Sequence, residues 1–130
     1  MMDPDEFGGT LVRISGLDEA AALSPDTEGV FVSAPSEALF ATLAARLPGL
    51  RHIITDGNTG GVTDAAVAHL AALGSLETLD LEWSAITDAS LAVLAGLPAL
   101  QWVDLGSVAA VTAEGLNALR AARPNLEIET

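Results

Sequence analysis

The sequence predicts one α/β domain built from a repeated unit of a short strand, a loop and a helix. Two patterns predict it: a six-residue L-x-x-L-x-L motif that recurs at nearly constant spacing, and an apolar helical block between successive copies. At 130 residues, half of them hydrophobic, the chain is long enough for one domain with a sizeable core. The apolar content argues against intrinsic disorder, and a chain without cysteine has no disulfides or thiolate metal sites.

The strand motif is clearest at residues 76–81, which read LETLDL. It recurs 24 residues later, at 100–105, as LQWVDL. A related copy, LRHIIT, begins 26 residues before the first of these, at Leu50, and a partial copy begins 26 residues after Leu100, at Leu126. A degenerate copy, TEGVFV, occupies 27–32. Each copy is L-x-x-L-x-L with substitutions.

A second block follows each of the clearer strand motifs and has the spacing of a helix. The blocks cover 65–73, 89–97 and 113–119, and a threonine precedes each of them. A threonine hydroxyl at the N-cap accepts a hydrogen bond from a backbone N–H that has no partner within the helix. Asp64 and Asp88 follow two of these threonines, where the helix dipole favours negative charge.

The two ends of the chain carry weaker forms of the same pattern. Residues 10–14 predict a strand and 17–23 a short helix, and we interpret 1–26 as an N-terminal cap, since the terminal unit of a repeat protein must be covered. Residues 36–47 predict a further helix. The single domain therefore comprises the cap, about four repeats over 27–126 and a C-terminal end at 127–130, where Leu126 and Ile128 close the stack.

These repeats resemble the leucine-rich repeat family in its bacterial form, with helical outer segments and an Ile-Thr-Asp signature. The resemblance is strong over 50–126, fair over 27–49 and absent from 1–26. It implies a right-handed solenoid with a short parallel sheet on the concave face and helices on the convex face. The position that the family fills with a buried Asn or Cys holds Asn58, Ser84 and Val108, so only Asn58 could bond the loop backbone in the family's manner.

Strand alternation predicts which side chains face the core and which face the concave surface. We expect the core-facing set to be Val30, Val32, Ile53, Thr55, Leu79, Leu81, Val103 and Leu105. We expect three concave rows: Gly29, His52, Thr78 and Trp102; then Phe31, Ile54, Asp80 and Asp104; then Ser33, Asp56, Glu82 and Gly106. Neighbouring strands lie about 4.8 Å apart, so side chains in one row touch.

The concave rows hold the candidate partner-binding residues: Phe31, His52, Ile54, Asp56, Asp80, Glu82, Trp102 and Asp104. We expect Phe31 and Ile54 to form an apolar patch and Trp102 to stand exposed as a binding anchor, because exposed aromatic residues mark interaction sites. We expect Asp56, Asp80, Glu82 and Asp104 to form a two-by-two carboxylate cluster.

Other interpretations of these residues stay open. Trp102 could pack against the C-terminal tail, and Trp83, at a strand end, is more in keeping with a structural role than with binding. The carboxylates could be a solvated acidic face, a recognition site for a basic partner, or a divalent-cation site, for which a flat sheet is poorly shaped. We expect no resident metal or cofactor.

The charge balance restricts the class of partner. Asp and Glu number 18 and Lys and Arg number 5, a formal charge of -13, which argues against nucleic acid and anionic membranes and favours a basic protein. No apolar run is long enough to span a membrane, and the first residues lack the pattern of a signal peptide, so we expect a cytoplasmic protein. Lysine and tyrosine are absent while alanine, glycine and leucine are abundant, which favours a GC-rich bacterial genome over a salt-adapted organism. No catalytic triad or phosphate-binding motif is evident, and we do not expect an enzyme.

We therefore predict a protein-interaction module that binds a basic protein through an acidic, aromatic-bearing concave face. Two alternatives remain. The chain could be a bacterial inhibitor or immunity-type protein that neutralises a basic effector, with carboxylates standing where phosphates would bind. It could also be an accessory subunit of an enzyme complex. Both rest on analogy from the fold.

Overall fold

Strands and helices alternate along the whole described chain. The computed structural model describes residues 11–56 and 61–130. Within these ranges the strands are β1 (Leu11–Ile14), β2 (Gly29–Ser33), β3 (His52–Asp56), β4 (Thr78–Asp80), β5 (Trp102–Asp104) and β6 (Glu127–Glu129). The α-helices of the same ranges are α1 (Leu17–Ala21), α2 (Glu37–Arg46), α3 (Asp64–Ala68), α4 (Asp88–Ala95) and α5 (Ala113–Ala122), and a 3₁₀ helix, η2 (His69–Ala72), continues α3.

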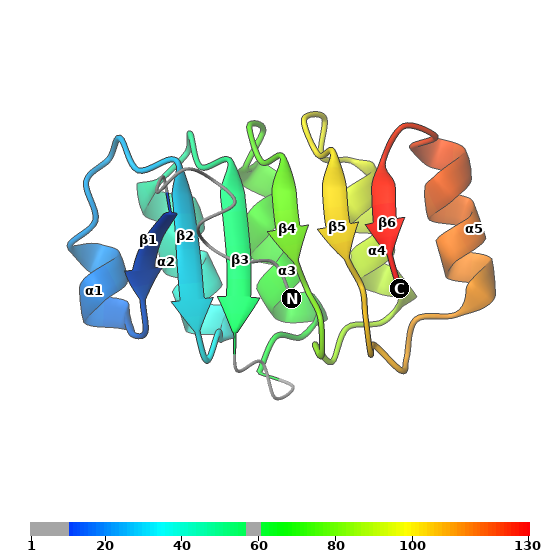
Figure 1. Cartoon of the computed structure of the whole chain (residues 1–130), viewed down its shortest axis with the longest axis horizontal. Helices are drawn as coiled ribbons and strands as arrows, with labels where there is room; N and C mark the ends of the chain where they lie inside the picture. The colour runs from blue at the N-terminus through cyan, green and yellow to red at the C-terminus, as the bar shows by residue number, and fades with distance from the viewer. Residues whose placement is uncertain (1–10, 57–60) are drawn as a thin grey trace.

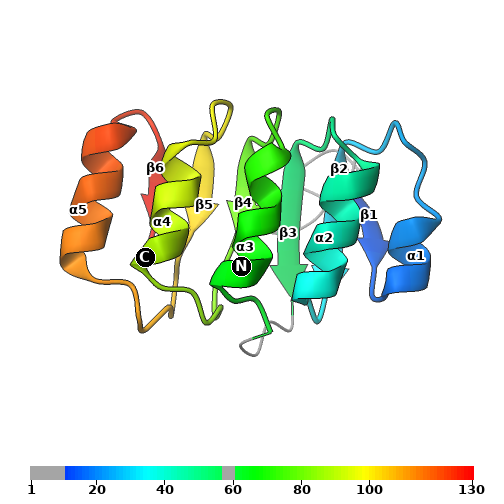
Figure 2. The same cartoon turned by 180° about the vertical axis from the view of Figure 1, so that it is seen from behind.

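The six strands of these ranges form one sheet in the order β1 to β6, so neighbours in the sequence are neighbours in space (Figure 1). Every pair is parallel. Figure 2 shows α2, α3 and α4 side by side over one face of the sheet, with α1 and α5 at its two ends. The predicted α/β class with a parallel sheet is confirmed. We call the sheet face turned away from these helices the open face.

The strand register confirms the predicted core. Val30 pairs with Ile53, Ile53 with Leu79, and Leu79 with Val103. The predicted core-facing residues are all buried between sheet and helices: Val30, Val32, Ile53, Thr55, Leu79, Leu81, Val103 and Leu105. Leucines from the helices and their C-terminal turns complete this layer, because the apolar stripe of each helix faces the same row of side chains.

Threonine caps begin two of the later helices as predicted. The Thr87 hydroxyl accepts a hydrogen bond from the Ala89 N–H at 3.2 Å, and the Thr112 hydroxyl accepts one from the Gly115 N–H at 3.0 Å. The Thr63 side chain makes no such cap. The helix predicted over 65–73 is shorter than expected: α3 ends at Ala68, and the tighter 3₁₀ turn η2 follows.

The aspartates after the cap threonines also join one unit to the next. The Asp64 carboxylate accepts hydrogen bonds from the Thr87 N–H at 2.9 Å, the Thr87 hydroxyl at 2.6 Å and the Ser90 hydroxyl at 2.5 Å. Asp88 repeats the pattern toward Thr112, at 2.9 and 2.5 Å. The Ile-Thr-Asp signature therefore links consecutive helix N-termini, a role beyond the expected effect on the helix dipole.

Arginines make a similar link at the other ends of the helices. The Arg46 guanidinium donates to the Leu23 carbonyl at 3.3 Å. Arg123 donates to the carbonyls of Leu97 and Leu100, the second at 2.8 Å. These carbonyls lie in the segments that follow α1 and α4, so each arginine bonds its own unit to the preceding one.

The first described unit is more regular than the sequence indicates. β1 and α1 confirm the predicted strand and helix, although Thr10 lies outside the described residues. β1 pairs in parallel with β2, Leu11 opposite Gly29, so 11–26 form a strand-and-helix unit like the others. Of the three residues at the family's Asn position, Ser84 has a buried hydroxyl without a hydrogen-bond partner, and Asn58 lies outside the described residues. No helix within 11–56 and 61–130 is long and apolar enough to cross a membrane.

Leu79→Ala tests the core register. Leu79 is fully buried, so we expect the variant to lose about 2–5 kcal/mol of unfolding free energy in chemical denaturation, through lost burial and a residual cavity. Leu17→Ala is the matched control, since Leu17 is 48% exposed, and it should cost less than about 1 kcal/mol. Equal losses in the two variants would contradict the register.

Candidate functional site

Alternation along the strands places the predicted rows on the open face. Gly29 pairs with His52, His52 with Thr78, and Thr78 with Trp102, which forms the first row. Phe31 pairs with Ile54, and Asp80 with Asp104, which gives the two halves of the second row. The face therefore has an apolar half on β2 and β3 and an acidic half on β4 and β5.

The large apolar side chains of the open face are buried, which corrects the prediction that Phe31, Ile54 and Trp102 are exposed. Their exposed fractions are 4%, 0% and 9%. The three residues form a second apolar cluster, separate from the main core, against which the half-buried Leu11 packs. The Arg13 guanidinium lies 4.7 Å from the centre of the Phe31 ring. At 9% exposed and within this cluster, Trp102 has the burial of a packing residue.

His52 and Thr78 also differ from expectation. The half-buried His52 has its Nδ1 atom 3.0 Å from the Thr78 hydroxyl, and Thr78, predicted to face solvent, is buried. Burial lowers the pKa of His52; the negative charge of Glu77 opposes this effect, the positive charge of Arg51 adds to it, and Glu28 opposes it more weakly. The lowered pKa keeps His52 neutral at pH 7, so it adds no positive charge to the open face.

The acidic half brings three of the four predicted carboxylates together. Asp80, Glu82 and Asp104 each have an oxygen that lies within 4.8 Å of one from each of the others, and we call these three residues the acidic cluster. Asp80 and Asp104 are buried, at 1% and 6% exposed, where exposure was predicted. Asp56 is exposed at the end of β3 and is not one of this group.

Turn formation explains why aspartates occupy these positions. Asp80 Oδ1 accepts a hydrogen bond from the Glu82 N–H at 3.0 Å, and Asp104 Oδ1 accepts one from the Gly106 N–H at 2.8 Å. A short side chain that bonds the backbone two residues later stabilises a turn. The same contact in consecutive units shows that both aspartates help to end their strands, and it places their carboxylates side by side.

The turn also sets the position of Trp83. Ala34, Trp83 and Ser107 occupy equivalent places after β2, β4 and β5, and all three have left-handed backbones, with φ of 52°, 66° and 58°. This conformation is rare for residues with a side chain. Trp83 is 59% exposed, and its indole N–H donates to Glu82 Oε1 at 2.9 Å. Trp83 is therefore the exposed tryptophan, and sequence reasoning, which favoured a structural role, missed it.

Burial makes the acidic cluster unfavourable in isolation. It raises the pKa of Asp80 to about 6, and the nearby charge of Asp104 adds to this effect, although the Glu82 N–H acts against it. Burial likewise raises the pKa of Asp104. Carboxylates held this close repel one another, so a cation placed among them would lower the free energy. A lysine or arginine side chain could supply that charge, and the oxygens are also of the type that divalent cations prefer.

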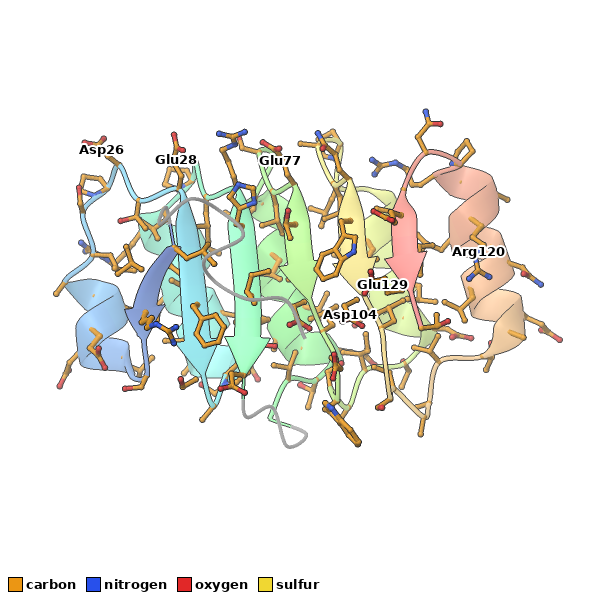
Figure 3. All side chains as sticks on the ribbon, in the orientation of Figure 1. Asp26, Glu28, Glu77, Asp104, Arg120 and Glu129 are labelled. Carbon is orange, nitrogen blue, oxygen red and sulfur yellow. The ribbon has the colours of Figure 1, made fainter. Side chains whose placement is uncertain are left out.

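Where the strands begin, the acidic residues have a basic partner. Figure 3 shows Glu28 and Glu77 where their strands begin, whereas Asp104 lies on the open face. Arg51 lies between those two glutamates, with Nε 2.5 Å from Glu77 and Nη1 3.5 Å from Glu28. The hydrogen bond from Arg51 lowers the pKa of Glu77. Asp80 and Asp104, whose pKa values are raised, lie instead toward the ends of their strands.

The chain matches no model of a protein family and no curated protein sequence.

Asp80→Asn tests whether the acidic cluster costs stability. The native pKa of about 6 exceeds the ordinary 3.8, so between these values the native state holds more protons than the unfolded state. The stability that Asp80 contributes is therefore full below about pH 4 and is lost as the pH rises through 6. Because an amide can still accept the Glu82 N–H, we expect Asp80→Asn to stabilise the fold at pH 7 by roughly 1–3 kcal/mol.

Denaturation of Asp80→Asn between pH 4 and pH 7 should also give a flatter stability profile than that of the wild type. The exposed Asp56 supplies the matched control, Asp56→Asn, which should leave both stability and profile unchanged. A loss of stability in Asp80→Asn at pH 7 would contradict this account of the cluster.

The tryptophans give a second stability test. Trp102→Ala removes a buried ring and should cost about 3–5 kcal/mol. Trp83→Ala removes an exposed ring and should change stability by less than about 1 kcal/mol. One denaturation curve per variant measures this difference, which is the reverse of the one expected from strand alternation alone.

Proposed function

We propose that the chain is a leucine-rich repeat protein that binds a basic protein partner at the strand-end side of its open face. The proposal extends the parallel order of six strands within the described residues to a right-handed solenoid with a concave sheet, the hand that parallel crossover connections take. The L-x-x-L-x-L spacing and the Ile-Thr-Asp links between units support it. In this proposal the surface binds and does not catalyse.

The observation that carries the proposal is the pairing of the acidic cluster with Trp83. Two of the three clustered carboxylates, Asp80 and Asp104, are buried and have raised pKa values, and an exposed indole lies beside them, hydrogen-bonded to Glu82. A lysine or arginine side chain from a partner would relieve the repulsion, and its cation could stack on the indole. Groups kept in an unfavourable state are typical of functional sites, where binding offsets their cost.

The binding residues of the proposal are those that a partner can reach. They are Trp83, Glu82 and the exposed Asp56, with Asp80 and Asp104 supplying charge from beneath. The net charge of -13 adds a long-range attraction that speeds encounter with a basic protein. Phe31, Ile54 and Trp102 support this surface from the neighbouring strands and are not contact residues in the proposal.

The experiment starts with capture of a partner from source-cell lysate on the immobilised chain, followed by binding kinetics with the captured protein. Glu82→Gln should slow association several-fold at low salt and less at high salt, since the lost charge acts mainly on encounter. Glu114→Gln, the same change at an exposed position on α5, is the matched control and should leave the rate nearly unchanged. Trp83→Ala should weaken affinity by roughly 30-fold, the effect of a central aromatic contact.

Acidification gives an independent measurement. Because the pKa of Asp80 is about 6, lowering the pH from 7 to 5 protonates it and removes a charge that the bound cation needs. Affinity should fall over that range in the wild type, and less in Asp80→Asn. An association rate that does not change with salt concentration, or equal effects of Glu82→Gln and Glu114→Gln, would show that the acidic cluster is not part of the binding site.

A further inference from the structure

The two end strands of the sheet differ from the inner ones in having one neighbour each. Within the described residues, β1 pairs only with β2 and β6 only with β5. A strand with an unpaired edge presents backbone N–H and C=O groups that can pair with another chain. Since all the pairs are parallel, a seventh strand that continued the sheet beyond β6 would run in the same direction as β1.

The core-facing row stops at an exposed apolar side chain at one end and a half-buried one at the other. Val12 pairs with Val30, and at the far end Val103 pairs with Ile128, so both Val12 and Ile128 belong to the core-facing row. Val30 and Val103 are fully buried, whereas Val12 is 42% exposed and Ile128 is partly buried. A strand added at either edge would cover them.

Apolar surface of complementary form lies beside each of these strands. Leu17, in the first turn of α1, is 48% exposed, and with Val12 it makes up two of the three large apolar residues exposed within the described ranges. At the other end, an open cavity of about 290 Å³ lies between the β5–α5 loop and α5. Its walls are mostly apolar: Leu105, Ser107, Val108, Ala109, Val111, Leu116 and Thr130.

The open-face row that contains Phe31 and Asp104 ends in opposite charges. Arg13 pairs with Phe31 at the β1 end, and Glu129 pairs with Asp104 at the β6 end. Both Arg13 and Glu129 are exposed. If β1 of one chain continued the sheet of another in the register of the existing pairs, Arg13 would lie opposite Glu129 and Val12 opposite Ile128. One register therefore places the two apolar side chains opposite each other and also the two opposite charges.

We propose that two copies of this chain associate head to tail, with β1 of one copy pairing in parallel along β6 of the other. In this arrangement α1 and its Leu17 lie against the apolar cavity beside α5. The contact joins different surfaces of the two copies, so it leaves one β1 and one β6 unused and can continue to longer assemblies. The net charge of -13 on each copy opposes the contact and limits its strength.

The mass of the full chain, measured by sedimentation velocity from about 10 µM to about 1 mM, tests the proposal. We expect the average mass of the wild type to rise above that of a monomer within this range. Val12→Lys places a charge in the core-facing row at the edge and should weaken association about tenfold or more, because edge lysines block strand pairing. Ala68→Lys adds the same charge at an exposed position on α3, away from both ends, and should leave association unchanged.

A charge exchange separates the proposed register from other modes of contact. Arg13→Glu and Glu129→Arg should each weaken association roughly two- to fivefold, the range for one exposed ion pair. The double variant restores opposite charges across the contact and should associate nearly as well as the wild type. Melting curves establish that each variant is folded. A monomeric wild type at every concentration, equal effects of Val12→Lys and Ala68→Lys, or a double variant weaker than either single one would overturn the proposal.

Discussion

No unit of this chain can bury its apolar residues without its neighbours. The row that runs from Val12 through Ile53 to Ile128 places one side chain per strand in register, and each inner member is covered by the units on both sides and by a helix. Because side chains alternate along a strand, a slip of one residue would turn a whole set toward the open face. The constant spacing of the strand motif avoids such slips.

Polar contacts repeat with the same period and hold the units together at three places. Asp64 and Asp88 join the helix N-termini, Arg46 and Arg123 bond the carbonyls at the helix C-termini, and Arg51 lies between glutamates at the strand starts. Each contact spans residues one unit apart. The acidic cluster follows the same period, since Asp80 and Asp104 are equivalent, but there the repetition brings like charges together.

Residue spacing was enough to predict the strands, the helices and the core-facing side chains, because all of them follow from the periods of two and 3.6. The same reasoning could not predict burial on the open face. Alternation says toward which face Phe31 and Trp102 point, and nothing about how far each side chain is removed from water there. Trp83 was missed because β4 ends at Asp80, and its left-handed backbone places the ring where no alternation applies.

The links at the helix N-termini have a consequence for how the molecule opens. The Asp64 carboxylate accepts hydrogen bonds from the unit that follows it and from no unit farther away. Each unit is therefore stabilised only by its immediate neighbours, as in a one-dimensional stack. Local unfolding should then begin at the two end units, each of which has a single neighbour. Amide hydrogens of β3 and β4 should exchange with solvent most slowly, and those of β1 and β6 most quickly, which gives a graded profile along the stack.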